Sequence, residues 1–406
     1  MIKTENKRTP VFVEPGSVYC SAGNNVSALW QALANGQQHL SALPCPAYDT
    51  WPWPQVFMVE EPGASELGVD RKILRTMEKQ AKMALYGAAL AVQQVETLSN
   101  KSIGSARKGL YLALPTVDES VPPWSLLETL HEVSATPAQP IELSSSEFLQ
   151  REIPAFFGLS TLNSNACAHI SACFDLTGAM GAYSPFADAA FQALIDATGA
   201  IAQGENTVAL VGGVSPKVNP QLLLQYEHWG WDKIPAFTPA EGSSFVVLTA
   251  NKNPGAVCVS GFARGFICNS ADASGTYQQL LAQALSSASI TAADIDWFLS
   301  FATDGKDIQA LFALGANTSL PILSSESCMG FAGAAGPLIN LNLALHGLQQ
   351  QKYLVNARND INERVDINEQ NNSNAQENTG ALRHVALSAA GPEGQYLVVI
   401  LSREAI

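Results

Sequence analysis

The chain has 406 residues, of which 47% are hydrophobic and only 14% charged, and 22 basic against 36 acidic residues give a net charge of -14 at pH 7. This charge disfavours binding to the phosphate backbone of nucleic acids and to anionic membrane surfaces. The length allows two ordinary domains or one large duplicated domain. The first ten residues lack the apolar core of a signal peptide, and the apolar runs are too short or too broken to span a bilayer, so we expect a cytoplasmic protein.

The first part of the chain combines a strand pattern with helical patterns. Residues 10–19 are typical of a short strand, and Asn25, after the next turn, can cap a helix over 26–34. Between residues 71 and 94, apolar side chains recur at helical spacing while charged side chains occupy the other face. This pattern predicts one amphipathic helix that packs on the core.

Later segments alternate buried strands with alanine-rich helices. Short apolar runs, the pattern of buried strands in an α/β sheet, occupy residues 109–114, 208–211, 244–248 and 396–401. Helices are predicted over 185–202 and 333–350, each after a turn that contains glycine. Since both halves end in similar strand and helix units, we expect a duplicated α/β fold with halves at 1–250 and 251–406. The asparagine-rich segment 359–380 predicts a mobile surface loop.

The cysteines and the chain's composition indicate no metal or cofactor. The seven cysteines are scattered and include no CxxC pair, which argues against a disulfide framework and against a zinc site. We therefore expect no bound metal and no cofactor.

Several blocks, in the same order along the chain, resemble the condensing enzymes of fatty-acid and polyketide synthesis, the ketosynthase I and II group. Residues 18–36 are similar to the opening strand, turn and first helix of that family. The other similar blocks are residues 157–161 with 168–171, 176–178, 204–214, 241–244 and 333–336. The resemblance covers most of the chain and implies the thiolase-like duplicated fold, in which helix and sheet layers alternate as αβαβα.

The same resemblance locates the positions of the catalytic residues. Condensing enzymes of this group use a cysteine thiolate at the start of a buried helix, where the helix dipole and backbone N–H groups lower its pKa and form an oxyanion hole. Two histidines and a lysine complete the usual set. Counting forward from Gly178 and backward from Gly213 leads to one nucleophile position, and it holds Ala187.

The remaining catalytic positions are also replaced. Phe301 and Phe331 stand at the two histidine positions, and Glu326 stands at the lysine position. Loss of the nucleophile together with the bases removes every group that covalent catalysis requires. We therefore predict no catalytic residue and no enzymatic activity of the chain on its own.

The resemblance implies a chain-length factor, a catalytically inactive ketosynthase-like subunit. Such a subunit pairs with an active β-ketoacyl-carrier-protein synthase and shapes the acyl tunnel during polyketide or aryl polyene chain elongation. The acyl carrier protein is expected to dock through the active partner, because this chain is itself acidic. Candidates for the tunnel or the interface are Trp124, Leu126, Leu127, Leu130, Tyr183 and Phe186.

Two other functions stay open at the level of sequence. The first is a thiolase-fold enzyme with a relocated nucleophile, a malonyl-carrier decarboxylase or acyltransferase, that uses Cys173, Cys328 or His169. The second is a homodimeric scaffold that has no catalytic partner. Turnover of malonyl-carrier that Cys328→Ala abolishes would favour the first, and a stable homodimer that ignores a ketosynthase would favour the second.

Overall fold

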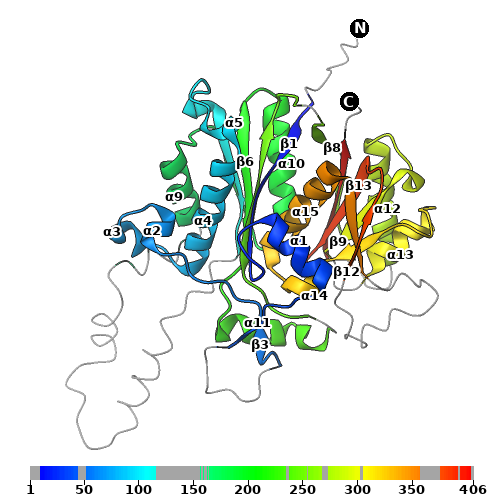
Figure 1. Ribbon diagram of the computed structural model, residues 1–406, viewed down its shortest axis with the longest axis horizontal. Helices are drawn as coiled ribbons and strands as arrows, with labels where there is room; N and C mark the ends of the chain where they lie inside the picture. The colour runs from blue at the N-terminus through cyan, green and yellow to red at the C-terminus, as the bar shows by residue number, and fades with distance from the viewer. Residues whose placement is uncertain are drawn as a thin grey trace, which may run out of the picture.

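The computed structural model describes residues 10–43, 52–115, 156, 159, 162, 164–234, 237–253, 255–267, 273–301, 305–356, 375–391 and 394–403 (Figure 1). Its strands are β1 (Phe12–Cys20), β2 (Ser41–Ala42), β3 (Gln55–Val56), β4 (Lys108–Ala113), β5 (Met180–Tyr183), β6 (Val208–Val214), β7 (Gly242–Thr249), β8 (Val257–Phe266), β9 (Trp297–Ser300), β10 (Ile322–Ser324), β11 (Lys352–Asn356), β12 (Ala375–Thr379), β13 (His384–Ala390) and β14 (Gln395–Arg403). Its α-helices are α1 (Val26–Asn35), α2 (Ala64–Leu67), α3 (Arg71–Leu74), α4 (Lys79–Gln94), α5 (Glu96–Ser99), α9 (Ser164–Phe174), α10 (Asp188–Ala202), α11 (Pro220–His228), α12 (Ala273–Ser287), α13 (Lys306–Ala313), α14 (Glu326–Met329) and α15 (Gly336–Gln350).

The main sheet consists of two repeats of the same topology. Within the described residues its strand order is β10-β9-β13-β14-β8-β1-β7-β6-β4-β5. In the repeat β1-β7-β6-β4-β5 the first two pairings are antiparallel and the last two are parallel. The repeat β8-β14-β13-β9-β10 has the same succession of antiparallel and parallel pairings. The chain also passes through the five strand positions in the same order in both repeats. The predicted duplicated α/β architecture is therefore confirmed.

Helices cover both repeats and also fill the space between them (Figure 1). The central helices α10 and α15 contact each other and both halves of the sheet, because α10 packs on β4, β6 and β14 while α15 packs on β1, β7 and β13. Helices α4 and α9 cover the outer face of the first repeat, and α12 and α13 cover that of the second. Both central helices follow the third strand of their repeat in chain order, so each begins at the carboxyl end of the parallel strands.

Local signals explain where the helices begin and end. Asn25 caps α1 as predicted, since its Oδ1 accepts from the Ala28 N–H at 2.9 Å, and Gly36 ends the helix in the left-handed conformation. The single helix predicted over 71–94 is wrong, because α3 ends at Leu74 and α4 begins only at Lys79. The interruption lies at Thr76, whose hydroxyl donates to the Ile73 carbonyl and whose own carbonyl accepts from Asn165 of α9.

Other predicted boundaries also change. The helix expected over 185–202 starts at Asp188, and a 3-10 turn over Gly333–Ala335 precedes α15. The segment 359–380, expected as a loop, ends in strand β12, which pairs with β11 along its whole length. The part of this segment before residue 375 lies outside the described residues. The expected division at residues 250 and 251 falls in the connection between β7 and β8.

Within the described ranges, every helix falls short of the length and apolar character that crossing a bilayer requires.

Candidate functional site

The position predicted for the nucleophile lies at the amino end of α10. Ala187, which occupies it, directly precedes the helix and is fully buried. Asp188, the first helical residue, is also buried, and its Oδ2 lies 3.5 Å from Nη2 of Arg264. Burial raises the pKa of Asp188, and the guanidinium of Arg264 opposes this shift. Neither Ala187 nor Asp188 carries a thiol or a hydroxyl that could attack a thioester.

The two histidine positions hold a stacked aromatic pair. The ring centroids of Phe301 and Phe331 are 5.2 Å apart, with 22° between the ring planes. Phe301 follows β9 and is fully buried, and Phe331 follows α14. The Phe301 ring fills space that only a glycine leaves open, because a Cβ atom added at Gly336 would lie 2.0 Å from the Phe301 Cζ atom. Neither ring can accept or donate a proton, so the pair supplies packing instead of acid–base chemistry.

An aromatic cluster continues from this pair toward the cavity beside Ala187. The rings of Trp231 and Phe237 lie 5.4 and 5.2 Å from that of Phe331, and Tyr226 stacks on Trp231 at 4.6 Å. The cavity that remains beside Ala187, Phe331 and Gly333 has a volume of about 30 Å³. This volume admits about two water molecules. The part of the cavity that the described residues line is too small for an acyl chain.

The residue predicted at the lysine position is an acid with a buried carboxyl oxygen. Glu326 is the first residue of α14, and its Oε1 atom is buried without a hydrogen-bond partner. Burial and the nearby charge of Asp307 raise its pKa to about 8. Asp307 is fully buried, and its Oδ2 accepts from the hydroxyls of Ser300 at 2.8 Å and Ser388 at 2.5 Å. At neutral pH Glu326 is therefore mainly protonated and carries no charge.

Of the three candidates for a relocated nucleophile, Cys328 shares the core of this site and the other two lie apart from it. Cys328 of α14 is fully buried among core residues. His169 and Cys173 belong to α9, which packs against α4 on the outer face of the sheet. The His169 Nε2 atom lies 3.1 Å from the Thr76 hydroxyl, burial lowers the His169 pKa, and Cys173 is exposed. Among the described residues, no three His, Cys, Asp or Glu side chains gather as metal ligands would.

The tunnel and interface candidates fall into two groups. Trp124, Leu126, Leu127 and Leu130 lie outside the described residues. Phe186 lines the remaining cavity and contacts Trp229, with 6.0 Å between their ring centroids. Tyr183 ends β5, the last strand in the sheet order, and its ring lies over Gly181, where a Cβ atom would come within 2.4 Å of its hydroxyl. Phe186 therefore lies beside Ala187 on this cavity, and Tyr183 lies on the strand that precedes both residues.

The aromatic cluster was not predicted from the sequence. Its members Tyr226, Trp229 and Trp231 lie on α11 and the turn after it, and Phe237 follows shortly. The signal was present in the dense aromatic run of residues 226–231. Nothing in the spacing of that run showed that it faces Phe331.

The fold and the site define a thiolase-like ketosynthase fold. The family model "Beta-ketoacyl synthase, N-terminal domain" matches residues 8–233, and the chain belongs to this family. Comparison with curated proteins gave no significant match.

Solved structures with the same fold include a β-ketoacyl synthase from Burkholderia phymatum STM815, with a TM-score of 0.75, 17% identity, and 98% of this chain and 100% of that chain covered. An oxazolomycin ketosynthase domain from Streptomyces albus JA3453 has a TM-score of 0.73 and 18% identity, and the match covers 98% of this chain and 74% of that chain. A type II polyketide synthase acyl-carrier protein in complex with its ketosynthase bound to the hexaketide gives a TM-score of 0.76 and 18% identity, with 98% and 100% covered. These likenesses confirm the predicted thiolase-like fold.

Proposed function

We propose that this chain is a non-catalytic ketosynthase-like subunit, a chain-length factor. It pairs with an active β-ketoacyl-carrier-protein synthase and shapes the acyl tunnel of that partner in polyketide or aryl polyene chain elongation. The observation that carries the proposal is the packing at the predicted catalytic positions, where Ala187 is fully buried, Phe301 stacks on Phe331, and Glu326 has a raised pKa.

The filling of the site supports a packing role over a modified activity. An enzyme that had changed its chemistry would keep a cavity for its substrate, and ligand pockets usually enclose several hundred Å³. Here the cavity beside Ala187 is about 30 Å³. The rings that close it also contact one another, so no single rotation of Phe331 reopens the pocket without disturbing Trp231 and Phe237.

The surface beside the site supports a partner subunit. Strand β5 pairs only with β4 among the described strands, so its other edge offers unpaired backbone groups. Met180 on this strand is 52% exposed. In the thiolase superfamily the subunits pair through this edge, and the complex of a ketosynthase with its acyl-carrier protein among the structural relatives supports a carrier-dependent assembly. The carrier is expected to dock on the active partner.

Co-expression with an active β-ketoacyl-carrier-protein synthase tests the proposal. We expect a stoichiometric heterodimer by light scattering. Met180→Asp should break it, because the substitution places a charge on the pairing strand. Ile73→Asp is the matched control, since Ile73 is 41% exposed on α3, away from β5. A soluble homodimer that does not bind the ketosynthase would reject the proposal, as would loss of the complex in both variants.

A further inference from the structure

A second cavity lies at the end of the core opposite to the filled catalytic site. Helix α15 begins at Gly336, beside Phe301, and its last turns reach this cavity through Leu345 and Gln349. At a rise of about 1.5 Å per residue, the helix separates Gly336 from Gln349 by about 20 Å. The cavity is therefore distinct from the former acyl site, and ketosynthase chemistry gives it no role.

The topology of the sheet creates this cleft at the seam of the two repeats. Strands β1 and β8 pair only at Phe12 with Cys258 and at Val13 with Val257. The next residues of β1, Glu14 and Pro15, line the gap together with Gly255 and Ala256 of the segment before β8. The cleft has a volume of about 460 Å³. This volume is typical of small-molecule sites.

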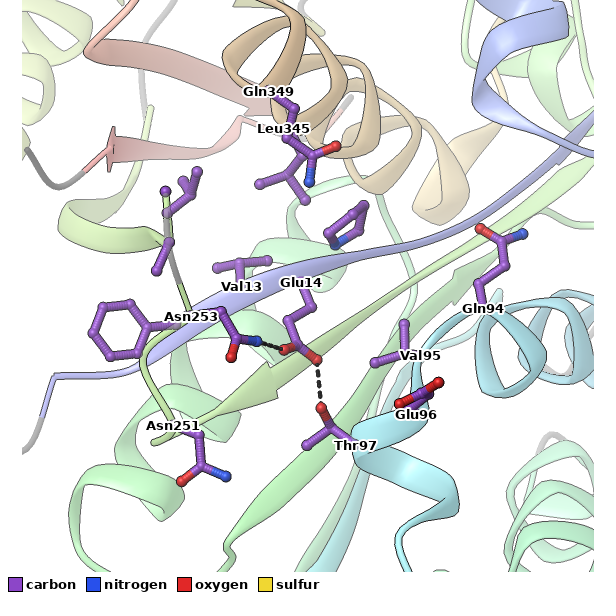
Figure 2. Close-up of a pocket in the computed structure, with 15 residues that line it drawn as sticks. Val13, Glu14, Gln94, Val95, Glu96, Thr97, Asn251, Asn253, Leu345 and Gln349 are labelled. Carbon is purple, nitrogen blue, oxygen red and sulfur yellow. Dashed lines mark hydrogen bonds between the residues drawn. The ribbon is translucent and has the colours of Figure 1, made fainter. Parts of the chain in front are cut away.

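The floor of the cleft carries a fixed carboxylate (Figure 2). Glu14 Oε1 accepts from Asn253 Nδ2 at 2.6 Å, and its Oε2 accepts from the Thr97 hydroxyl at 2.9 Å. Figure 2 shows the Glu14 side chain pointing between these two residues, with Gln94 and Glu96 further along the same wall. Each carboxylate oxygen keeps a further lone pair for a ligand. The position of the carboxylate is thus set before any ligand arrives.

The lining favours a positively charged ligand with a short carbon chain. It contains two carboxylates, Glu14 and Glu96, and none of its described residues is Lys, Arg or His. Arg403 lies behind Gly255 but outside the lining, and its Nη1 donates to the Leu348 carbonyl at 3.1 Å. The net charge of -14 further raises the local concentration of cations. The apolar part of the lining, formed by Val13, Val95 and Leu345, can cover methylene groups.

We propose that this cleft is a binding site for an alkyl diamine, with one ammonium group on Glu14, the other toward Glu96, and the carbon chain against the apolar wall. Ammonium groups donate charge-assisted hydrogen bonds to carboxylates, and these are stronger than bonds between neutral groups. This inference does not rest on the role as a chain-length factor, because it concerns a different end of the molecule.

Calorimetric titration of the purified full chain with butane-1,4-diamine tests the site. We expect saturable binding of one diamine with a dissociation constant below about 1 mM. Glu14→Gln, which keeps the size of the side chain, should weaken binding at least about tenfold. Thr97→Val, which removes one donor to Glu14 without a change of charge, should weaken it less.

Two controls separate a site from general attraction by an acidic protein. Glu227→Gln makes the same change of net charge at an exposed position of α11 and should leave the affinity unchanged. Butane-1,4-diol, which has the same chain length but no charge, should not bind. The proposal is overturned if no saturable binding occurs, if both Gln variants lose affinity equally, or if the diol binds as tightly as the diamine.

Discussion

Glu326→Gln should remove a large part of the pH dependence of stability, because Glu326 holds its proton far above the normal range. The pKa of Glu326 rises from 4.5 to about 8 in the folded protein. In the unfolded chain the carboxyl ionises near its normal pKa, so between these two values the folded state binds more protons than the unfolded state. The contribution of this group is fully present below the lower value and is lost as pH rises toward the upper one.

The size of the effect follows from the width of this window. One proton difference changes the free energy of unfolding by about 1.4 kcal/mol per pH unit. From pH 5 to pH 8 the stability should therefore fall by at most about 4 kcal/mol through this one group. Glutamine has nearly the same shape and no ionisable proton. The free energy of unfolding of the variant should therefore rise relative to that of the parent protein by up to this amount between pH 5 and pH 8.

Urea unfolding of both proteins at pH 5, 6, 7 and 8, followed by tryptophan fluorescence, measures this difference. Subtracting the two plots of unfolding free energy against pH removes the contributions of the other titrating groups, since these groups are common to both proteins. Glu227→Gln, at an exposed position of α11, should show a nearly constant difference from the parent. A flat difference for Glu326→Gln across the whole range would refute the claim that Glu326 is held neutral by burial and by Asp307.

Three further predictions address the filled site and its surroundings. Gly336→Ala should destabilise the protein by about 2 kcal/mol or more, because the new Cβ atom would overlap the Phe301 ring. Gly199→Ala in α10 is the control and should be neutral or stabilising, because a Cβ atom there meets nothing within 4 Å. Thermal unfolding of both variants distinguishes the two effects. Ala187→Cys should fold but show no turnover of malonyl-carrier in the absence of the partner, and measurable decarboxylation by this variant would show that Ala187 was the only missing group. Trp124→Ala should lengthen or redistribute the products of the complex, as product mass spectrometry can establish, and an unchanged product profile would remove Trp124 from the tunnel.

The parts of the fold that the sequence predicted are those governed by local or repeated patterns. The apolar runs became the central strands β4, β6, β7 and β14, and Asn25 caps α1, because burial on both faces and capping leave direct marks in the sequence. The break between α3 and α4 was not visible, since it depends on Asn165, which is distant in sequence and takes the Thr76 carbonyl. The pairing of β12 with β11 was likewise not predicted, because a long connecting segment separates the two strands in the sequence.

The candidate site shows the same division. The four catalytic positions were predicted from the family blocks, and the structure places two of these residues, Ala187 and Phe331, on one cavity. What filled the cavity was not predicted, because the cluster of Tyr226, Trp231 and Phe237 forms only when α11 folds against the loop after α14. The raised pKa of Glu326 was also not predicted, since it depends on burial and on the charge of Asp307, and the fold creates both.

The geometry indicates which of the four replacements holds the others in place. A cysteine at Ala187 adds one atom beside a small cavity, and a lysine at Glu326 would find the carboxylate of Asp307 nearby. Histidines at Phe301 and Phe331 are different, because they would put ring nitrogens into two stacked rings, one of which also packs on Trp231 and Phe237. Each ring nitrogen left without a hydrogen-bond partner there would cost about 1–3 kcal/mol, a cost that a cysteine at Ala187 does not carry. Under the proposed function, the packing of Phe301 and Phe331 therefore keeps this site closed more strongly than the absence of a sulfur at Ala187 does.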